Sequence, residues 1–274
     1  MEVSDNKSIW EILKKWHIPT DNLEEISLFL DNYSYLSFDL VPSFIINRED
    51  TLSGFKLNTF ILSAKMTLDS IILCTGMLRL SDAFELVRKY RDSVCFFTYA
   101  ILTYKIANND MNTDIINWYK NKMHNYNGEK FKSLFEKIEL KEFERKYDIR
   151  GKYSNYNKLL NNYVHSNGIK YMNINQYCSY EGYSFFKEKI DSDVNNIYTI
   201  TAFFTLLFVS MIAIVYPSSI RSTDYLDCID LGISPNEDSL YWCAPFLSDF
   251  FAKHGRILGD DLIKYLYKKT EMRI

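Results

Sequence analysis

Residues 197–216 form a run of twenty positions without a charged side chain, and Pro217 follows directly. A run of this length is sufficient for a helix that crosses a lipid bilayer. However, it contains four threonine or serine residues, and two aspartates separate it from its nearest basic residues, Lys187 and Lys189. A membrane helix is usually flanked more directly by basic residues. We therefore expect a helix that is buried on all sides in the centre of a soluble protein, with a membrane span as the alternative.

The composition indicates a chain that folds around a substantial core. Its 274 residues are enough for one large domain or two small ones, and 47% of them are hydrophobic, with only 9 Gly and 5 Pro. Disordered chains have the opposite composition. The formal net charge is −3, with 32 basic and 35 acidic residues. Because no overall positive field would attract nucleic acid, any contact with RNA must be local.

The five cysteines indicate free thiols rather than disulfide bonds. Their number is odd, no two of them form a C-x-x-C pair, and Cys74 and Cys95 fall within apolar helical patterns. Buried free thiols point to a reducing compartment. The first residues also lack the basic and apolar regions of a secretory signal. We therefore expect a cytoplasmic protein.

Helical periodicity dominates the chain and is clearest in two long segments. From residue 55 to 77, and again from 82 to about 107, apolar side chains recur every three or four residues, which is the spacing of one helix face. Asp82 and Glu85 form a capping box that would start the second helix. Because only a short turn connects the two segments, we expect the helices to pack antiparallel.

Shorter patterns precede this pair. Residues 8–17 carry one apolar stripe, and Asp21 with Glu24 forms a capping box for a helix that continues through residue 30. Residues 33–46 are apolar and aromatic, and they are compatible with either irregular structure or a short strand.

A series of shorter helices is predicted after the long pair. Polar turns, one of them at Arg150-Gly151, separate the first three, and an acidic loop at 224–238 precedes the last two. The predicted ranges are 114–124, 129–146, 154–166, 246–255 and 259–270.

These patterns together predict an all-α fold. We expect a helical bundle of roughly eight to ten helices with a long antiparallel pair and little or no sheet. Its parts would be an N-terminal helical segment at 1–54, a helical core at 55–170 and a C-terminal helical region at 171–274 packed on that core. Alternatively, the three parts form one continuous domain.

The signatures of common enzyme and metal sites are absent from the sequence. It has no phosphate-binding loop, no dinucleotide-binding glycine fingerprint, no H-E-x-x-H and no G-x-S-x-G motif. The cysteines and the four histidines also lack zinc-binding spacing. We therefore expect neither a metal nor a cofactor.

Two segments carry residues that are suited to chemistry. In the first, residues 87–92 (VRKYRD), Arg91 falls on the apolar stripe of its helix, where a guanidinium needs a carboxylate or a ligand as its partner. In the second, residues 161–168 (NNYVHSNG), His165 lies in the last turn of its helix. Both segments are therefore candidates for a binding or catalytic site.

These segments resemble helical bacterial proteins of the HEPN type (higher eukaryotes and prokaryotes nucleotide-binding), many of which are abortive-infection or toxin proteins. Several such families carry an Arg followed by an acidic residue on one long helix and a Tyr-Val-His or similar ending on a later helix. Here the matching residues are Arg91-Asp92 and Tyr163-Val-His165. The resemblance covers roughly residues 55–170, and it implies a defence or toxin protein that binds a nucleotide or cleaves RNA without a metal.

The chain departs from this pattern just before the histidine. The ribonuclease members usually carry an Arg four to six residues before the His, where this chain has Leu159 and Leu160, and only Lys158 supplies a positive charge. Arg88 or Arg91 would replace the missing guanidinium if the two helices pack together, because a planar fork of donors suits a phosphate.

In the RNA-cleaving hypothesis each candidate residue has a role. His165 would move the proton of the ribose 2′-hydroxyl, and Arg88 and Arg91 would stabilise the charge that develops on the phosphate. The product would be a 2′,3′-cyclic phosphate. The neighbouring polar residues would orient these groups or bind the RNA, and they are Asp92, Asn161, Asn162 and Lys158.

Other interpretations of the same residues stay open. His165 is alternatively a helix cap or a core histidine, and Arg91 with Asp92 an internal salt bridge. The protein is then a non-catalytic helical sensing or interaction module, or an effector anchored in a membrane by residues 197–216. RNA or a nucleotide is the expected partner, and a homodimer is compatible with the sequence.

Overall fold

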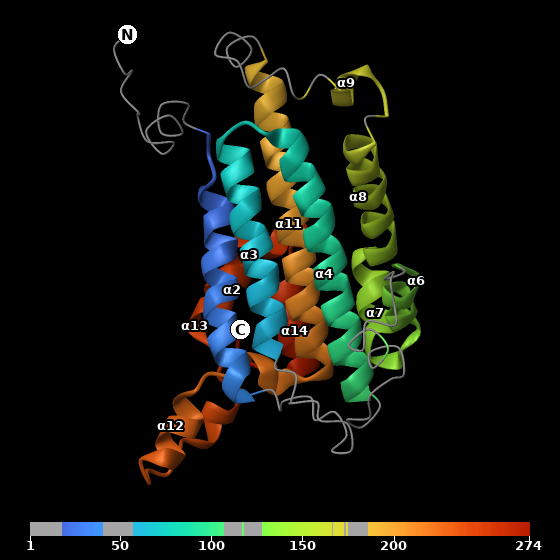
Figure 1. The fold of residues 1–274 in the computed structure, drawn as a ribbon. Coiled ribbons are helices and arrows are strands. Elements are labelled where there is room, and N and C mark those ends of the chain that lie inside the picture. Colours follow the sequence, from blue (N-terminus) through green and yellow to red (C-terminus); the bar gives the residue numbers. More distant parts are fainter. Residues whose placement is uncertain are drawn as a thin grey trace, which may run out of the picture.

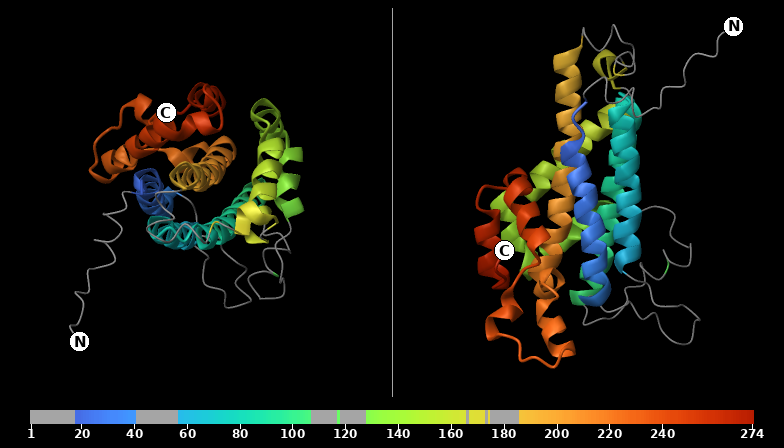
Figure 2. Two further views of the ribbon diagram at one scale, coloured as in Figure 1. Left: turned by 90° about the horizontal axis from the view of Figure 1, so that it is seen from above. Right: turned by 90° about the vertical axis from the view of Figure 1, so that its left-hand side faces the viewer.

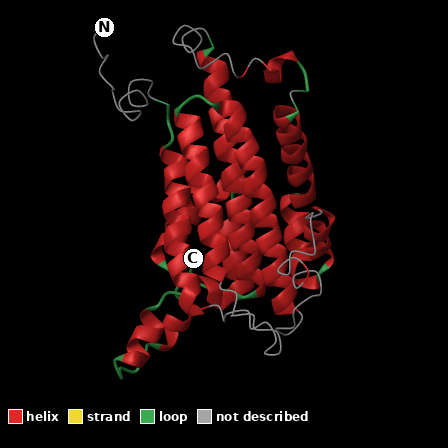
Figure 3. Ribbon diagram, viewed as in Figure 1, coloured by secondary structure: helices red, strands yellow, loops and turns green. Residues whose placement is uncertain are grey.

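The structure is a computed structural model, and it describes residues 18–40, 57–106, 117, 128–165, 167–172, 174 and 186–274. The helix predicted at 8–17 and most of the one predicted at 114–124 lie outside the described residues. Within them, every regular element is a helix, with two isolated bridges and no strand (Figure 3). The predicted all-α bundle is therefore confirmed.

Five long helices build most of the described chain. They are α2 (Asp21–Leu40), α3 (Leu57–Gly76), α4 (Leu80–Ile106), α8 (Ile149–Val164) and α11 (Lys187–Val215). Shorter helices connect and cover them, and these are α6 (Gly128–Ser133), α7 (Ile138–Tyr147), α9 (Ile169–Met172), α12 (Asp224–Asp230), α13 (Pro245–His254) and α14 (Leu262–Thr270).

Helix α11 lies at the centre of this arrangement (Figure 1). Seen from above, α2, α3 and α4 form a curved layer on one side of it, and α13 and α14 lie on the other (Figure 2). Contacts from α2, α4, α7 and α14 surround α11. The buried side chains form one hydrophobic cluster, which draws on all three of the predicted parts of the chain.

The charge-free segment is buried inside the fold, as predicted, and the choice between a soluble protein and a membrane span stays a prediction. Helix α11 is the one described helix that is long and apolar enough to cross a membrane, and 83% of its most apolar window is buried inside the fold. Two of its hydroxyl side chains form hydrogen bonds within the helix, since Thr201 donates to the Ile197 carbonyl and Thr205 to the Thr201 carbonyl, whereas the buried Ser210 hydroxyl has no partner among the described residues. A helix that is apolar on all sides is thus accommodated by surrounding it with other helices.

The N-terminal end of α2 differs from the prediction. The helix begins at Asp21, so Asp21 lies in the first turn and is not the residue before the helix, as the predicted capping box requires. The Thr20 hydroxyl donates to the Glu24 carboxylate over 2.7 Å. The helix also extends ten residues beyond residue 30, to Leu40, so the undecided stretch is helical at least over 33–40.

The long antiparallel pair is confirmed as α3 and α4, which pack against each other and are joined by the turn at 77–79. Helix α4 starts at Leu80, two residues earlier than the predicted cap at Asp82. In the structure, Asp82 lies in the first turn and forms an ion pair of 2.5 Å with Arg79. An acidic residue in the first turn is favourable because it interacts with the positive end of the helix dipole.

Two predicted helix boundaries were wrong in the middle of the chain. The range 129–146 is interrupted at Lys137, whose backbone is extended, and α8 begins at Ile149 rather than 154. The expected turn at Arg150-Gly151 lies inside α8. Asp148 provides the start instead, because its backbone is left-handed (φ 49°) and its carboxylate accepts a hydrogen bond from the Gly151 amide over 3.3 Å.

The C-terminal predictions agree more closely with the structure. Helices α13 and α14 match the two predicted amphipathic ranges to within three residues. The acidic stretch at 224–238 is not all loop, since it contains α12. The four cysteines among the described residues are free thiols, as predicted.

A buried hydrogen bond joins the central helix to α4. The Tyr90 and Thr205 hydroxyls are 2.7 Å apart, and both residues are buried. Thr205 already donates its only proton to the Thr201 carbonyl, so Tyr90 is the donor and Thr205 the acceptor.

We predict that Thr205→Val destabilises the protein more than Tyr90→Phe does. The valine variant leaves the Tyr90 hydroxyl proton buried without an acceptor, which costs about 1–3 kcal/mol, whereas the phenylalanine variant leaves every donor paired and costs about 1 kcal/mol. Urea unfolding of both single variants and of the double variant tests this. Additive effects would contradict direct coupling between the two hydroxyls.

Candidate functional site

Helices α4 and α8 are neighbours, as the RNA-cleaving hypothesis requires. The rings of Phe84 and Tyr163 stack with their centroids 3.6 Å apart. Two turns further along α4, Arg91 contacts Asn157 of α8. Because the sequence numbers rise on one helix as they fall on the other, the two helices run antiparallel.

Arg91 is buried and neutralised within the bundle. Arg91 is only 5% exposed. Nε and Nη2 donate to the same Asp92 carboxylate oxygen, over 3.0 Å and 2.7 Å, and Nη1 donates to the side-chain oxygen of Asn157. The salt-bridge interpretation of Arg91 and Asp92 therefore holds, and an anion would have to displace Asp92 to bind this guanidinium.

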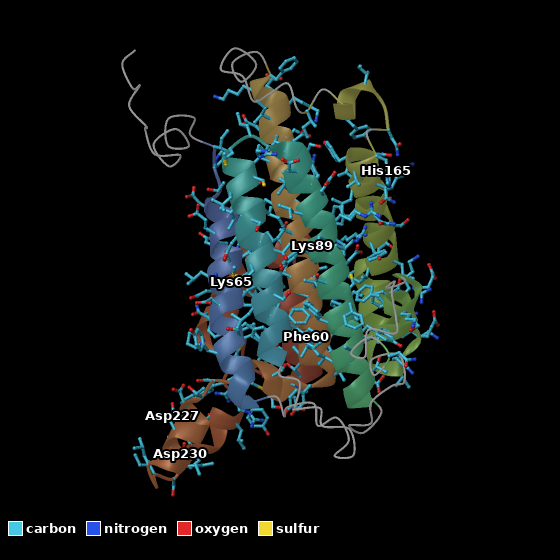
Figure 4. All side chains as sticks on the ribbon, in the orientation of Figure 1. Phe60, Lys65, Lys89, His165, Asp227 and Asp230 are labelled. Atoms are coloured by element: carbon cyan, nitrogen blue, oxygen red, sulfur yellow. The ribbon has the colours of Figure 1, made fainter. Side chains whose placement is uncertain are left out.

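His165 lies at the far end of α8 from this pair. It is the C-terminal cap of the helix, its backbone amide is bonded to the Asn161 carbonyl, and its side chain is exposed. Figure 4 shows it at the end of α8 that leads to α9. Eight residues separate it from Asn157, which corresponds to about 12 Å along the helix axis. The structure therefore does not bring the His165 imidazole to the Arg91 guanidinium.

The remaining predicted residues are distributed between these two places. Arg88 is half-buried one turn before Arg91, and Lys158 is exposed on α8. Asn161 and Asn162 are half-buried. Asn162 donates to the Tyr171 hydroxyl over 3.2 Å and accepts from Asn167 over 3.3 Å, so it fixes the chain where it leaves α8.

A second polar cluster, which the sequence did not reveal, joins α2, α11 and α13. His254 is only 2% exposed, although it ends a helix. Its Nδ1 lies 2.9 Å from the Tyr198 hydroxyl, and its Nε2 lies 3.5 Å from a carboxylate oxygen of Glu25. The same carboxylate accepts a hydrogen bond from Lys253. A buried imidazole thus lies between a carboxylate and a phenol.

This geometry determines which nitrogen of His254 carries the proton. An ionised carboxylate only accepts hydrogen bonds, so Nε2 is the protonated nitrogen and donates toward Glu25. Nδ1 then accepts from Tyr198. Burial lowers the pKa of His254 from its ordinary 6.5, against the opposing influence of Glu25, and burial raises the pKa of the Tyr198 phenol. Both groups are therefore neutral at pH 7.

His254 and Glu25 line a small groove of about 260 Å³ between α2 and α13. Its walls combine charged residues with the aromatic side chains of Phe29, Phe246 and Phe250, and the Phe29 and Phe250 rings stack 3.8 Å apart. Among the described residues, no group of three or more His, Cys, Asp and Glu is placed to hold a metal ion. The cluster can hold a proton and join three helices, and the helix-joining role accounts for all of its contacts.

Sequence periodicity contained a signal for His254. Residues Leu247, Phe250, Phe251 and His254 follow the spacing of one helix face, so the histidine continues an apolar stripe. A titratable residue on such a stripe needs a buried partner. Its partners Glu25 and Tyr198 were not identifiable, because they lie 229 and 56 residues away in the chain.

An arm projects from the bundle of described helices (Figure 1). It comprises residues 222–242, includes α12, and extends away from the other helices (Figure 1). Its two ends are joined at the base, where the Ser222 amide donates to the Trp242 carbonyl over 2.8 Å and Arg221 forms an antiparallel bridge with Cys243. The arm is therefore held to the bundle at both of its ends.

The tip of the arm is ordered and apolar. Gly232 ends α12 in a left-handed conformation (φ 67°), and the following Ile233 amide donates to the Cys228 carbonyl over 2.8 Å. Around this turn, Ile229, Leu231 and Ile233 are exposed, with Leu231 at 73%. Three large aliphatic side chains are thus gathered in water on one projecting turn.

The arm is also acidic. The sequence from 222 to 252 contains no Lys or Arg. Asp227 and Asp230 are exposed on α12 (Figure 4), whereas Asp238 is paired with Arg273 over 3.0 Å at the base. The aliphatic tip is therefore bordered by negative charge that pairs with no Lys or Arg among the described residues.

Comparison with known proteins returned no match: no family model, no curated protein and no solved structure is detectably similar to this chain. The HEPN resemblance therefore stays a prediction from the sequence.

We predict that the protein loses stability as the pH falls below 6.5, and that His254 accounts for part of this loss. Its pKa is lower in the folded chain than the ordinary 6.5, so the unfolded chain binds a proton that the folded one does not. The stabilisation is present above pH 6.5 and is lost as the pH falls toward the lower folded pKa. Urea unfolding between pH 8 and 5 measures it.

His254→Gln should show a weaker decline over the same pH range, because glutamine does not titrate. The comparison uses slopes, so a constant offset from altered packing does not affect it. Equal slopes in the two proteins would mean that His254 does not govern the acid sensitivity.

Proposed function

We propose that this protein is a non-catalytic helical interaction module that binds a partner protein through the arm at 222–242. The observation that carries the proposal is the exposed aliphatic tip formed by Ile229, Leu231 and Ile233. Contiguous exposed apolar surface is unfavourable in water, and on soluble proteins it commonly marks an interaction site. A projecting turn also fits readily into a concave surface of another protein.

The charge around the tip indicates the chemistry of that partner. Asp227 and Asp230 border the tip, and no basic residue of the arm balances them. A partner surface with an apolar pocket and basic rim residues would be attracted, whereas the phosphates of nucleic acid or of an anionic membrane would be repelled. A basic protein surface is therefore the partner that best fits the arm.

RNA cleavage by the HEPN-type residues receives less support. Arg91 is occupied by Asp92 and Asn157, and His165 is about 12 Å further along α8. General acid–base catalysis at a phosphate needs the proton-transfer group and the cationic group within reach of one substrate atom. In the described residues, the His165 imidazole and the Arg91 guanidinium lie at separate places along α8.

Replacing Leu231 and Ile233 by serine should abolish partner binding without affecting the fold. The side chains are exposed, so the variant should melt within a few degrees of the wild type. In affinity capture from a lysate of the native host, the variant should retain about tenfold less, or still less, of each protein that the wild type retains. A tenfold loss of affinity corresponds to about 1.4 kcal/mol of binding free energy. Retention by the wild type should also weaken as salt is raised, because the border is acidic.

The matched control is Ile138→Ser with Ile169→Ser, which removes two exposed aliphatic side chains far from the arm in sequence. This control should retain the same proteins as the wild type. If the arm variant captures the same set as the control, the arm is not the binding surface.

We further predict that the wild type and His165→Ala leave bulk RNA equally intact, with and without a chelator. The separation of His165 from Arg91 is the reason. Gel analysis with end-group detection provides the measurement. The appearance of 2′,3′-cyclic phosphate ends with the wild type, but not with the variant, would restore the RNA-cleaving hypothesis.

A further inference from the structure

A groove of about 580 Å³ follows the outer seam between α2 and α3. The residues that line it recur every three or four positions on each helix, so they form two facing stripes. From α2 these are Glu24, Ser27, Leu28 and Asp31, and from α3 they are Lys65, Asp69, Ile72 and Leu73. The groove is separate from the arm in the chain and shares no residue with it.

The outer sides of α2 and α3, in the groove and next to it, carry more exposed apolar surface than the core requires. Leu28 is 61% exposed and Met66 is 65% exposed, and Leu62 and Leu73 are exposed as well. The opposite faces of α2 and α3 already supply the buried core residues, among them Ile26 and Ile71. In the right-hand view of Figure 2, α2 and α3 lie side by side at the surface. A helix that is apolar on two sides is normally covered on both.

The charged residues that line the groove give it a net negative charge. Asp69 accepts from the Ser27 hydroxyl over 2.5 Å and from the Lys65 ammonium over 2.9 Å, so the only cation of the lining is already neutralised (Figure 4 labels Lys65). Glu24 and Asp31 form no ion pair with a described Lys or Arg. They lie seven residues apart on α2, which corresponds to about 10 Å along the helix.

We propose that this groove binds an amphipathic helix from a partner protein. The helix would place an apolar stripe against Leu28 and Leu73 of the lining and against Met66, which follows Lys65 in α3. On the side toward α2, it would present two basic side chains about two turns apart to Glu24 and Asp31.

Packing and charge both select this occupant. A third helix laid on the seam of two antiparallel helices is the ordinary packing solution of helical bundles, and helix-in-groove binding is a recurrent mode of recognition. The Glu24 and Asp31 carboxylates, which pair with no described Lys or Arg, favour a cationic helix over an acidic one, and over RNA or an anionic lipid surface. Because the contact spans only a few helical turns, the affinity should be on the order of micromolar.

Two synthetic peptides test the proposal. Both are capped helices of about 18 residues with the same leucine stripe, and they differ only in carrying either Lys or Glu at two flanking positions seven residues apart. Fluorescence anisotropy at low and physiological salt should show that the lysine peptide binds at least about tenfold more tightly than the glutamate peptide. Failure of the lysine peptide to bind, or equal binding of both, overturns the proposal.

Variants of the protein locate the binding. Leu28→Ser with Met66→Ser should weaken the lysine peptide by about tenfold or more, and Glu24→Gln with Asp31→Asn should reduce the difference between the two peptides. The exposed pair Ile138→Ser and Tyr267→Ser is the matched control and should bind normally. If the groove variants and the control behave alike, the peptide binds elsewhere and the proposal fails.

One more pair of measurements distinguishes binding in this groove from binding at the arm of residues 222–242. The arm variant with Leu231→Ser and Ile233→Ser should bind the lysine peptide as the wild type does. The proposal for the groove and the proposal for the arm are therefore tested independently. A chain that lacks residues 1–17 should also bind it unchanged. If binding occurs only in that shortened chain, the groove is occupied by the protein's own N-terminal segment and not by a partner.

Discussion

The charge-free part of helix α11, from residue 197 onward, has no charged side to present to water, and the arrangement of the other helices follows from that constraint. Burying it on all sides requires neighbours around its whole circumference, and α2, α4, α7 and α14 provide them. The hydroxyl groups of Thr201 and Thr205 cause no penalty, because each donates to a carbonyl of the helix itself. Each surrounding helix turns one face to α11 or to another neighbour, and its opposite face is then available for solvent or for a partner.

Much of this architecture could be predicted from periodicity, because burial of one helix face leaves a regular trace in the sequence. The ranges of α3, α4, α13 and α14 were expected to within a few residues. The errors arose where a local side-chain interaction overrides the pattern. Gly151 was expected to interrupt a helix, but the Asp148 carboxylate accepts from its amide and caps α8 there instead. Such a bond depends on the three-dimensional position of one side chain, which periodicity does not record.

The site was less predictable, for a related physical reason. Burial of Arg91 followed from its position on an apolar stripe, and its partner Asp92 is adjacent in sequence. The second partner, Asn157, and the position of His165 relative to Arg91 depend on the register between α4 and α8, which no local pattern specifies. His254 was overlooked as a site residue for the same reason, since its contacts with Glu25 and Tyr198 arise only when three separate helices pack together.

The distribution of charge connects the two proposed surfaces. The chain as a whole is nearly balanced, with a net charge of −3, so neither surface is explained by a general acidic character. At both surfaces, acidic side chains that pair with no described Lys or Arg lie close to exposed aliphatic side chains, with Asp227 and Asp230 near Leu231, and Glu24 and Asp31 near Leu28. Apolar surface contributes affinity without much selectivity, whereas adjacent charge of one sign rejects partners of the same sign. The combination at both places therefore favours cationic protein partners and disfavours nucleic acid.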